Sequence, residues 1–261
     1  MIIVRPIRFT AHMAAHRVLL NALGASLLTD APGWEVYGLG SGRLALHAAD
    51  LDGSADAAGA PDSPPSGTTV LAFETDDLSE WMAKASARGL NVQLKAMDRG
   101  PVAEVRARRH RFEVDEVDDL NRPADFSPGA GSKVSVLQIW YSPDAQAARA
   151  VIEKAGPVPR IAADDGIWAD FTCAGGGLVG VHAEEDVAVE LAFEFDGDIS
   201  ELSATLSTAG VRHHVIDEKF SRCIRIPDPD LDGHIQINER QRDLYGFSDF
   251  SQQQANQPVG Q

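Results

Sequence analysis

Two histidines stand at the same place in two similar stretches of the chain. His47 ends GSGRLALH at residues 40–47, and His182 ends GGGLVGVH at residues 175–182. An imidazole ligates metals, exchanges protons near neutral pH and forms hydrogen bonds, so a repeated histidine is a candidate for metal binding or ligand recognition. The alternative is that each is a hydrogen-bonded packing residue inherited from one ancestral copy.

The residues around each histidine alternate as in a strand. Leu44 and Leu46 fall on one face and His47 on the other, while Val179 and Val181 lie opposite His182, because side chains alternate along a strand. We expect the aliphatic face to pack under helices and both histidines to point into a cleft.

The closing strand of each copy offers a second pair of polar residues. In HRFEV, Glu113 lies opposite Phe112 and Val114, and in HIQIN the apolar neighbours put Gln236 at the matching position. A carboxylate and an amide oxygen can ligate a hard or borderline cation.

The elements that position these residues occur twice and in the same order. Each copy has a helix closed by glycine (16–24 and 148–156), a hairpin ending in the histidine (34–47 and 167–182), a strand and helix (70–93 and 190–214), and closing strands (103–117 and 222–240). The repeat predicts modules at 1–117 and 134–245, a linker at 118–133 and a disordered tail at 246–261. The Pro-rich residues 50–67 are expected to form a surface loop.

This order, written twice, resembles the vicinal oxygen chelate superfamily, which includes glyoxalases, bleomycin resistance proteins and extradiol dioxygenases. The resemblance covers residues 5–117 and 134–245. It implies an α+β fold of two tandem βαβββ-type modules with curved sheets facing a central cleft. Members of the superfamily bind a metal and a small substrate, or a drug, in that cleft.

The metal that the resemblance implies meets a difficulty in the first strands. Ligands in the superfamily come from the first and last strands of each module, and the first-strand positions correspond here to Arg5 and Leu137, which cannot ligate. Gln138 is one residue out of register, and a one-residue slip turns a side chain to the other face. We therefore predict no metal site of the superfamily type and no cofactor, with a divalent metal ion as the alternative.

A second metal pattern lies near the end of the chain. Residues 228–239, DPDLDGHIQINE, match the calcium loop of an EF-hand. An EF-hand needs an entering helix, which Pro227 and Pro229 would break. We interpret the segment as a tight acidic turn before the last strand.

Composition narrows the class of partner. The 261 residues include 23 Lys and Arg and 39 Asp and Glu, giving a net charge of −16, which disfavours nucleic acid as a partner. The N-terminus has no signal-peptide pattern and no stretch has the length of a membrane span, so we expect a cytoplasmic protein without a membrane partner. Cys173 and Cys223 are expected to be buried small hydrophobes.

These observations predict a ligand site lined by His47, Glu113, His182 and Gln236, with Trp34, Trp140 and Trp168 as its wall. The expected ligand is a small molecule, cationic or aromatic. The sequence favours a glyoxalase/bleomycin-resistance-like binding protein without a metal of the superfamily type. The alternative is a metal-dependent lyase, isomerase or dioxygenase of the same superfamily. Whether two chains form a homodimer is left open.

Overall fold

A computed structural model describes residues 1–49, 64–97, 99–107, 110–117, 132–218 and 221–250. The described helices are α1 (Met13–Ala22), α2 (Leu78–Ala87), α3 (Ala145–Ala155) and α4 (Ile199–Thr208). The strands of the first half are β1 (Ile2–Val4), β2 (Ile7–Thr10), β3 (Ser26–Ala31), β4 (Trp34–Gly38), β5 (Arg43–Ala48), β6 (Thr69–Val70), β7 (Ala72–Thr75), β8 (Val92–Met97), β9 (Gly100–Ala107) and β10 (His110–Glu116). Those of the second half are β11 (Val134–Ser142), β12 (Val158–Ala163), β13 (Trp168–Thr172), β14 (Leu178–Ala183), β15 (Ala188–Phe195), β16 (His214–Asp217), β17 (Arg222–Pro227), β18 (His234–Glu239) and β19 (Phe247–Asp249).

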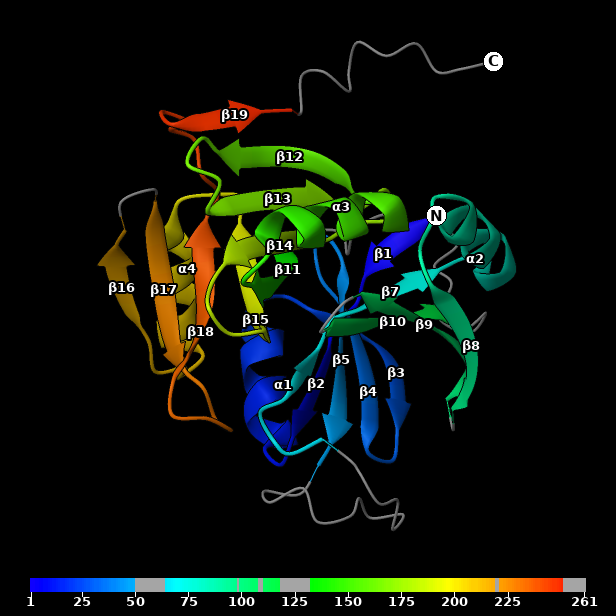
Figure 1. The fold of residues 1–261 in the computed structure, drawn as a ribbon. Helices are drawn as coiled ribbons and strands as arrows, with labels where there is room; N and C mark the ends of the chain where they lie inside the picture. The colour runs from blue at the N-terminus through cyan, green and yellow to red at the C-terminus, as the bar shows by residue number, and fades with distance from the viewer. Residues whose placement is uncertain (50–63, 98, 108–109, 118–131, 219–220, 251–261) are drawn as a thin grey trace.

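The two halves repeat one strand order. The second half is a single sheet in the order β16-β17-β18-β15-β11-β14-β13-β12-β19. The first half has the same neighbours in two sheets, β8-β9-β10-β7-β1 and β6-β2-β5-β4-β3, because the strand matching β11 is split into β1 and β2 (Figure 1). Pro6 stands at this split and has no N–H to donate to a ladder. The α+β class and the tandem modules that the sequence predicts are confirmed.

Each half holds two βαβββ units rather than one. In the second half, β11-α3-β12-β13-β14 is followed by β15-α4-β16-β17-β18. The predicted linker and most of the Pro-rich loop at 50–67 lie outside the described residues, so the module boundaries and that loop stay predictions. One part of the predicted tail is wrong: residues 247–249 form β19, which pairs antiparallel with β12 at the top of Figure 1.

One hydrophobic core runs through both halves. It contains the inward side chains of all four helices and the helix-facing side chains of the strands, including Leu44, Leu46, Val179 and Val181. The aliphatic faces predicted to pack under helices therefore do so. We call the face of each sheet opposite the helices its inner face.

Buried polar contacts also join the halves. The Gln138 side chain donates to the Ala72 carbonyl and accepts from the Ala72 N–H, both at 3.1 Å. The Trp81 indole of α2 donates to the carbonyl of Ala155 at the end of α3, at 2.8 Å. The halves are therefore fixed to each other by directional bonds as well as by apolar packing.

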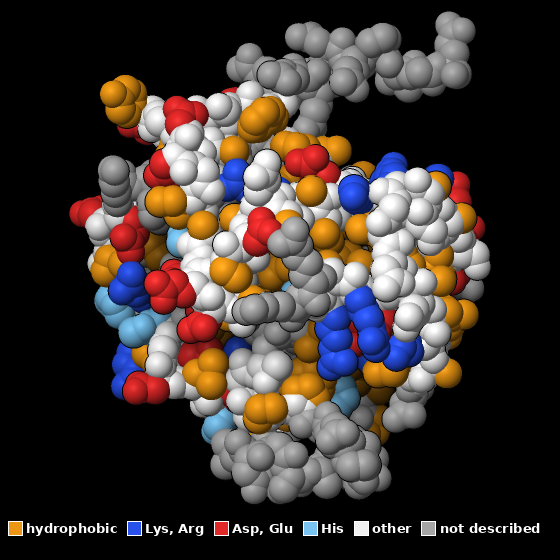
Figure 2. All heavy atoms as spheres, viewed as in Figure 1, with side chains coloured by type: hydrophobic (Ala, Val, Ile, Leu, Met, Phe, Trp, Pro, Cys, Tyr) orange, Lys and Arg blue, Asp and Glu red, His pale blue; other side chains and the backbone are white. Residues whose placement is uncertain are grey.

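Basic residues of β8, β9 and β10 are partly neutralised by an acidic neighbour on β9. Glu104 lies within ion-pair distance of Lys95, Arg106 and Arg111. Figure 2 shows basic side chains beside acidic ones on this side of the molecule rather than an unbroken basic surface.

A bilayer crossing needs a long apolar helix, and none of the four described helices, with at most 11 residues, meets that requirement.

Candidate functional site

His47 lies on the inner face of the first half, as parity predicts. Its ring is 4.8 Å from the ring of Phe9 and 5.7 Å from that of Trp34. Its Nδ1 lies 2.8 Å from the Ala48 carbonyl oxygen, which therefore accepts a hydrogen bond from the ring.

His182 occupies the equivalent place in the second half. Its ring is 5.4 Å from Tyr141 and 6.2 Å from Trp168. Its Nδ1 is buried and has no hydrogen-bond partner among the described residues. The described ring contacts of each histidine stay within its own half, so they form two aromatic groups, and one cleft lined by both histidines stays a prediction.

Ion pairs cross the inner face of the first half. Arg5 is 1 % exposed and pairs with Glu74 and Asp115, and Arg99 pairs with Glu113 and Asp115. Burial lowers the pKa of Arg5 to about 10, against the opposing effect of Glu74. Glu113 lies at its predicted position, but its carboxylate already faces a cation from the same chain. It is therefore a poor attractant for a cationic guest.

The positions at which the fold would hold a metal do not fit one. In the second half, strand register puts Leu137, Ala192 and Gln236 side by side on β11, β15 and β18. The first half has Arg5, Ala72 and Glu113 in the matching row. Each row supplies a single oxygen ligand, whereas a protein metal site normally needs three or four. In the first half a buried guanidinium is the cation instead.

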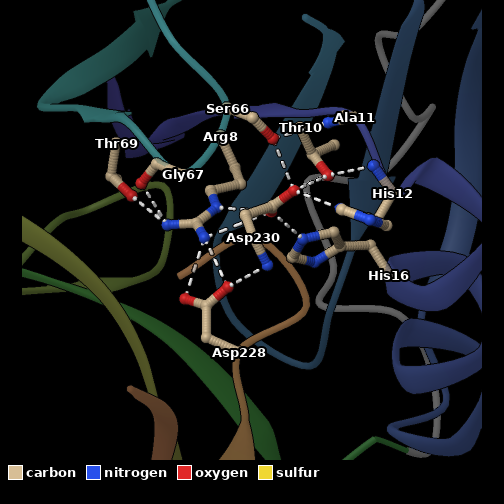
Figure 3. A network of polar contacts seen from close by, with 10 residues as sticks. All are labelled: Arg8, Thr10, Ala11, His12, His16, Ser66, Gly67, Thr69, Asp228 and Asp230. Atoms are coloured by element: carbon tan, nitrogen blue, oxygen red, sulfur yellow. Dashed lines mark hydrogen bonds and ion pairs between the residues drawn. The ribbon is translucent and has the colours of Figure 1, made fainter. Parts of the chain in front are cut away.

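A polar cluster joins the acidic turn before β18 to the first half (Figure 3). We call it the clasp, and its side chains are those of Arg8, Thr10, His12, His16, Ser66, Asp228 and Asp230. The Asp230 side chain is fully buried and accepts hydrogen bonds from Thr10 and Ser66, both at 2.7 Å. Its oxygens also lie 3.0 Å from His12 Nδ1 and 2.9 Å from His16 Nε2. Burial would raise the pKa of Asp230, but the hydrogen bonds from His16, Ser66, His12 and Thr10 outweigh burial and hold it well below its ordinary value.

The clasp binds its carboxylates with an arginine rather than a metal. His16, Asp228 and Asp230 could ligate an ion, since their ligand atoms lie within 4.8 Å of one another. Arg8 Nη2, however, lies 2.6 and 2.8 Å from the two Asp228 oxygens and 3.2 Å from Asp230. The residues present therefore form charge-assisted hydrogen bonds between the Arg8 guanidinium and the two carboxylates. The acidic turn can be recognised in the sequence, but its partners cannot, because they lie about 160 to 220 positions away.

A pocket of about 390 Å³ lies between the halves, on the helix-facing side of the sheets. Its walls come from the last residue of β9 and the first residue of β10 in the first half, and from the end of β11, the start of α3 and the residue before β15 in the second. The lining residues are Ala107, His110, Trp140, Ser142, Pro143, Asp144, Ala147, Ala148, Val151 and Val187.

Two ring nitrogens in the pocket wall lack partners. His110 and Trp140 come from different halves, and their ring centroids lie 4.9 Å apart. Trp140 is 3 % exposed, and its Nε1 and His110 Nε2 are both buried without a hydrogen-bond partner among the described residues. Burial, with a smaller effect of Arg111, lowers the pKa of His110 to about 4, so the ring is neutral at neutral pH.

Of the residues predicted to bind ligand, Trp140 alone is among those lining this pocket. The other six lie elsewhere in the described residues: His47, Glu113, His182, Gln236, Trp34 and Trp168. Parity directed the sequence argument to the inner faces, whereas His110 and Trp140 lie on the opposite face. The signal that could have identified His110 is its place at the start of a closing strand, next to the turn.

Solved structures show where this architecture occurs elsewhere. No protein-family model matches the chain, and neither does any curated protein sequence. The structure is similar to homoprotocatechuate 2,3-dioxygenase from Arthrobacter globiformis, with a TM-score of 0.56, 14 % identity, and coverage of 92 % of this chain and 79 % of that one. It is also similar to the 2,3-dioxygenase LapB from Pseudomonas sp. KL28 (TM-score 0.55, 13 % identity, 92 % and 91 % coverage) and to a catechol 2,3-dioxygenase (TM-score 0.58, 10 % identity, 92 % and 88 % coverage). With its repeated βαβββ units and these similarities, the chain has the fold of the extradiol dioxygenases of the vicinal oxygen chelate superfamily, in tandem form.

Proposed function

We propose that this chain binds a small molecule in the pocket between its halves, without a metal at the positions that the resemblance implies. The observation that carries the proposal is a largely apolar pocket of about 390 Å³, two of whose lining residues each carry a buried ring nitrogen without a partner among the described residues. A ligand site has this composition: apolar surface for affinity and a few polar atoms for orientation. Buried polar groups without partners are uncommon in proteins, and these two belong to residues that line the pocket.

The metal-free part of the proposal is supported by the rows across the inner faces. In the second half, two of the three neighbouring positions are occupied by Leu137 and Ala192, which cannot ligate a metal. In the first half, the corresponding two positions are occupied by Arg5 and Ala72, which cannot ligate one either. A shared fold does not carry a reaction with it, since different chemistries occur on one fold. Binding of the glyoxalase/bleomycin-resistance-like kind therefore suits these residues better than dioxygenase chemistry.

A metal-dependent lyase, isomerase or dioxygenase is the second candidate. It is supported by the dioxygenases among the similar structures and by the grouping of His16, Asp228 and Asp230. Such an enzyme would have to use the clasp, and Arg8 would have to leave it.

Elemental analysis separates the two candidates. Protein purified without chelator and dialysed against iron, manganese or zinc is expected to retain well under one equivalent of metal. The variants Glu113→Ala and Asp230→Asn tell the two possible metal positions apart. If the protein retains a stoichiometric metal and Glu113→Ala removes it, the metal is bound at the superfamily-type position. If Asp230→Asn alone removes it, the metal is bound in the clasp.

A further inference from the structure

The pocket and the clasp are equivalent places in the two halves. His47 pairs with Phe9, and His182 pairs with Tyr141, so these two pairs correspond. One residue further back on the helix-facing side, Arg8 therefore corresponds to Trp140. By the same register, Thr10, which pairs with Ala48, corresponds to Ser142, which pairs with Ala183.

The helices that follow extend this correspondence. His12 is the N-cap of α1 and Asp144 is the N-cap of α3. Four residues after each N-cap come His16 and Ala148. The clasp residues Arg8, Thr10, His12 and His16 thus become Trp140, Ser142, Asp144 and Ala148 in the pocket wall.

The strands that face these residues match as well. The clasp receives Asp228 and Asp230 from the turn between β17 and β18, and the pocket is bordered by Ala107 and His110 at the ends of β9 and β10. Glu113 and Gln236 hold equivalent positions on β10 and β18, since they pair with Ala72 and Ala192. The end of β2 thus lies against the turn between β17 and β18, and the end of β11 lies near Ala107 of β9 and His110 of β10.

The exchanged residues explain why one junction is filled and the other is hollow. In the clasp, a guanidinium, two imidazoles and two hydroxyl groups surround the fully buried carboxylate of Asp230. In the pocket, Ala148 replaces an imidazole and leaves space, and the indole of Trp140 replaces the guanidinium. No Lys or Arg is among the described lining residues.

Among the described lining residues the one carboxylate, that of Asp144, is already engaged and is no free countercharge for a cation. Asp144 Oδ1 accepts a hydrogen bond from the N–H of Ala147 at 3.0 Å, as an N-cap does, in the first turn of α3. An indole N–H can only donate, whereas the neutral imidazole of His110 can accept at Nε2 when its proton is on Nδ1. A ligand that pairs with both atoms therefore needs an acceptor for the indole N–H and a donor for His110 Nε2.

We propose that the pocket binds an uncharged, flat aromatic molecule whose polar group accepts a hydrogen bond from Trp140 Nε1 and donates one to His110 Nε2. A primary aromatic amide has this pattern: its carbonyl oxygen accepts and its N–H donates. This inference rests on the proposed function, because it names the ligand class for the same pocket.

Four small probes test the ligand class, three of which have the same shape. Benzamide is neutral and both accepts and donates, benzoate is anionic and only accepts, and benzamidine is cationic and only donates; toluene supplies the ring alone. Binding is measured by calorimetry and by the indole N–H signals in the nuclear magnetic resonance spectrum. We expect benzamide to bind at least about tenfold more tightly than the other three, because two buried hydrogen bonds are gained without burying a charge. The Trp140 signal should shift, and those of the other tryptophans should stay in place.

The outcomes distinguish the two proposals. Tighter binding of benzoate, benzamidine or toluene, with the Trp140 signal shifting, would overturn the ligand class and leave the binding function standing. Saturable binding that shifts Trp34 or Trp168 instead would move the ligand to an inner face and overturn both. If none of the four probes saturates by about 10 mM, a range that weak fragments reach, the binding function is overturned.

Variants assign the two hydrogen bonds. Trp140→Phe keeps an aromatic wall without the donor, and His110→Phe keeps a ring without the acceptor. Each is expected to weaken benzamide about fivefold to tenfold, with little effect on toluene, since one hydrogen bond contributes about 1 kcal/mol. His214→Phe, at an exposed position on β16, is the matched control and should leave binding unchanged. Equal losses for benzamide and toluene would contradict the hydrogen-bond assignment, and the unsubstituted protein still reports through Trp140 if a variant fails to fold.

Discussion

At the scale of single residues, some buried polar groups have several hydrogen-bond partners, and others have none among the described residues. Asp230 has no exposed side-chain surface and is contacted by four donors besides Arg8. His110 and Trp140 each bury a ring nitrogen that has no partner among the described residues. A satisfied buried group stabilises a fold and an unsatisfied one costs free energy, so the two junctions differ in stability as well as in shape.

Asp230→Asn is expected to lower the free energy of unfolding by about 3 kcal/mol, because Arg8 and His16 lose an ionised partner while remaining buried. Urea denaturation at neutral pH measures this change. The difference should narrow below about pH 4: Asp230 has a lowered pKa when folded, so its stabilisation is complete above its unfolded pKa and is lost as the pH falls. Asp232→Asn, in the exposed part of the same turn, is the control. An equal loss in both variants would contradict the role of the clasp.

His110→Phe tests the buried neutral imidazole. Between about pH 6.5 and pH 4 the unfolded chain binds a proton at His110 that the folded chain does not, so stability falls as the pH falls through this range. The variant lacks this proton uptake, and its stability should lose about 1–3 kcal/mol less across the same interval. Denaturation curves at pH 4, 5, 6 and 7 give the comparison, and parallel profiles would show that His110 is charged or exposed in the folded state.

At the scale of elements, the sequence predicted what depends on local period. Alternation placed His47, His182, Glu113 and Gln236 on inner faces and their aliphatic neighbours in the core, because strand parity is a property of the backbone. Asp77, Asp144 and Asp198 begin α2, α3 and α4 as side-chain caps, while His12 at the start of α1 contacts Asp230 instead.

What escaped prediction depends on contacts between distant residues. The short segment Phe247–Asp249 becomes a strand because the edge of β12 supplies a partner, although its own sequence resembles a tail. The partners of Asp230 and the meeting of His110 with Trp140 require knowing how the halves pack. Spacing along the chain contains no record of that packing.

Gln138→Leu tests the joint between β11 and β7. The side chain has no exposed surface, and it bonds both backbone polar groups of Ala72 in the other half. Leucine has a similar size but leaves the Ala72 N–H buried without this partner, so unfolding is expected to become easier by about 1–3 kcal/mol. Gln93→Leu, at an exposed position on β8, should change stability by less than about 0.5 kcal/mol. Indistinguishable denaturation midpoints would show that the joint contributes nothing net.

At the scale of the whole molecule, the halves form one cooperative unit because their main core is shared. Leu20 of α1, Phe73 of β7, Ile152 of α3 and Leu206 of α4 are all fully buried members of one cluster. Exposing the helix-facing side of either half would leave the other half with bare apolar surface.

Chemical denaturation is therefore expected to show a single transition, with tryptophan fluorescence and far-ultraviolet circular dichroism giving the same midpoint. Asp230→Asn should move that midpoint without splitting it, because the shared core remains. Two separated transitions, or a first transition seen by only one probe, would show that the halves unfold independently.

The correspondence between the clasp and the pocket has a consequence for how such a molecule can change. If one half associated with an identical copy of itself around a twofold axis, both junctions would be the same surface, and every substitution would appear in both. A residue that opened one cavity would remove the opposite fastening as well. With both halves in one chain, the residue at the Arg8 position can stay an arginine while its counterpart is Trp140. Fusion of the halves into one chain therefore lets the two junctions diverge. One junction holds the halves together, and the other can change its shape to bind a ligand.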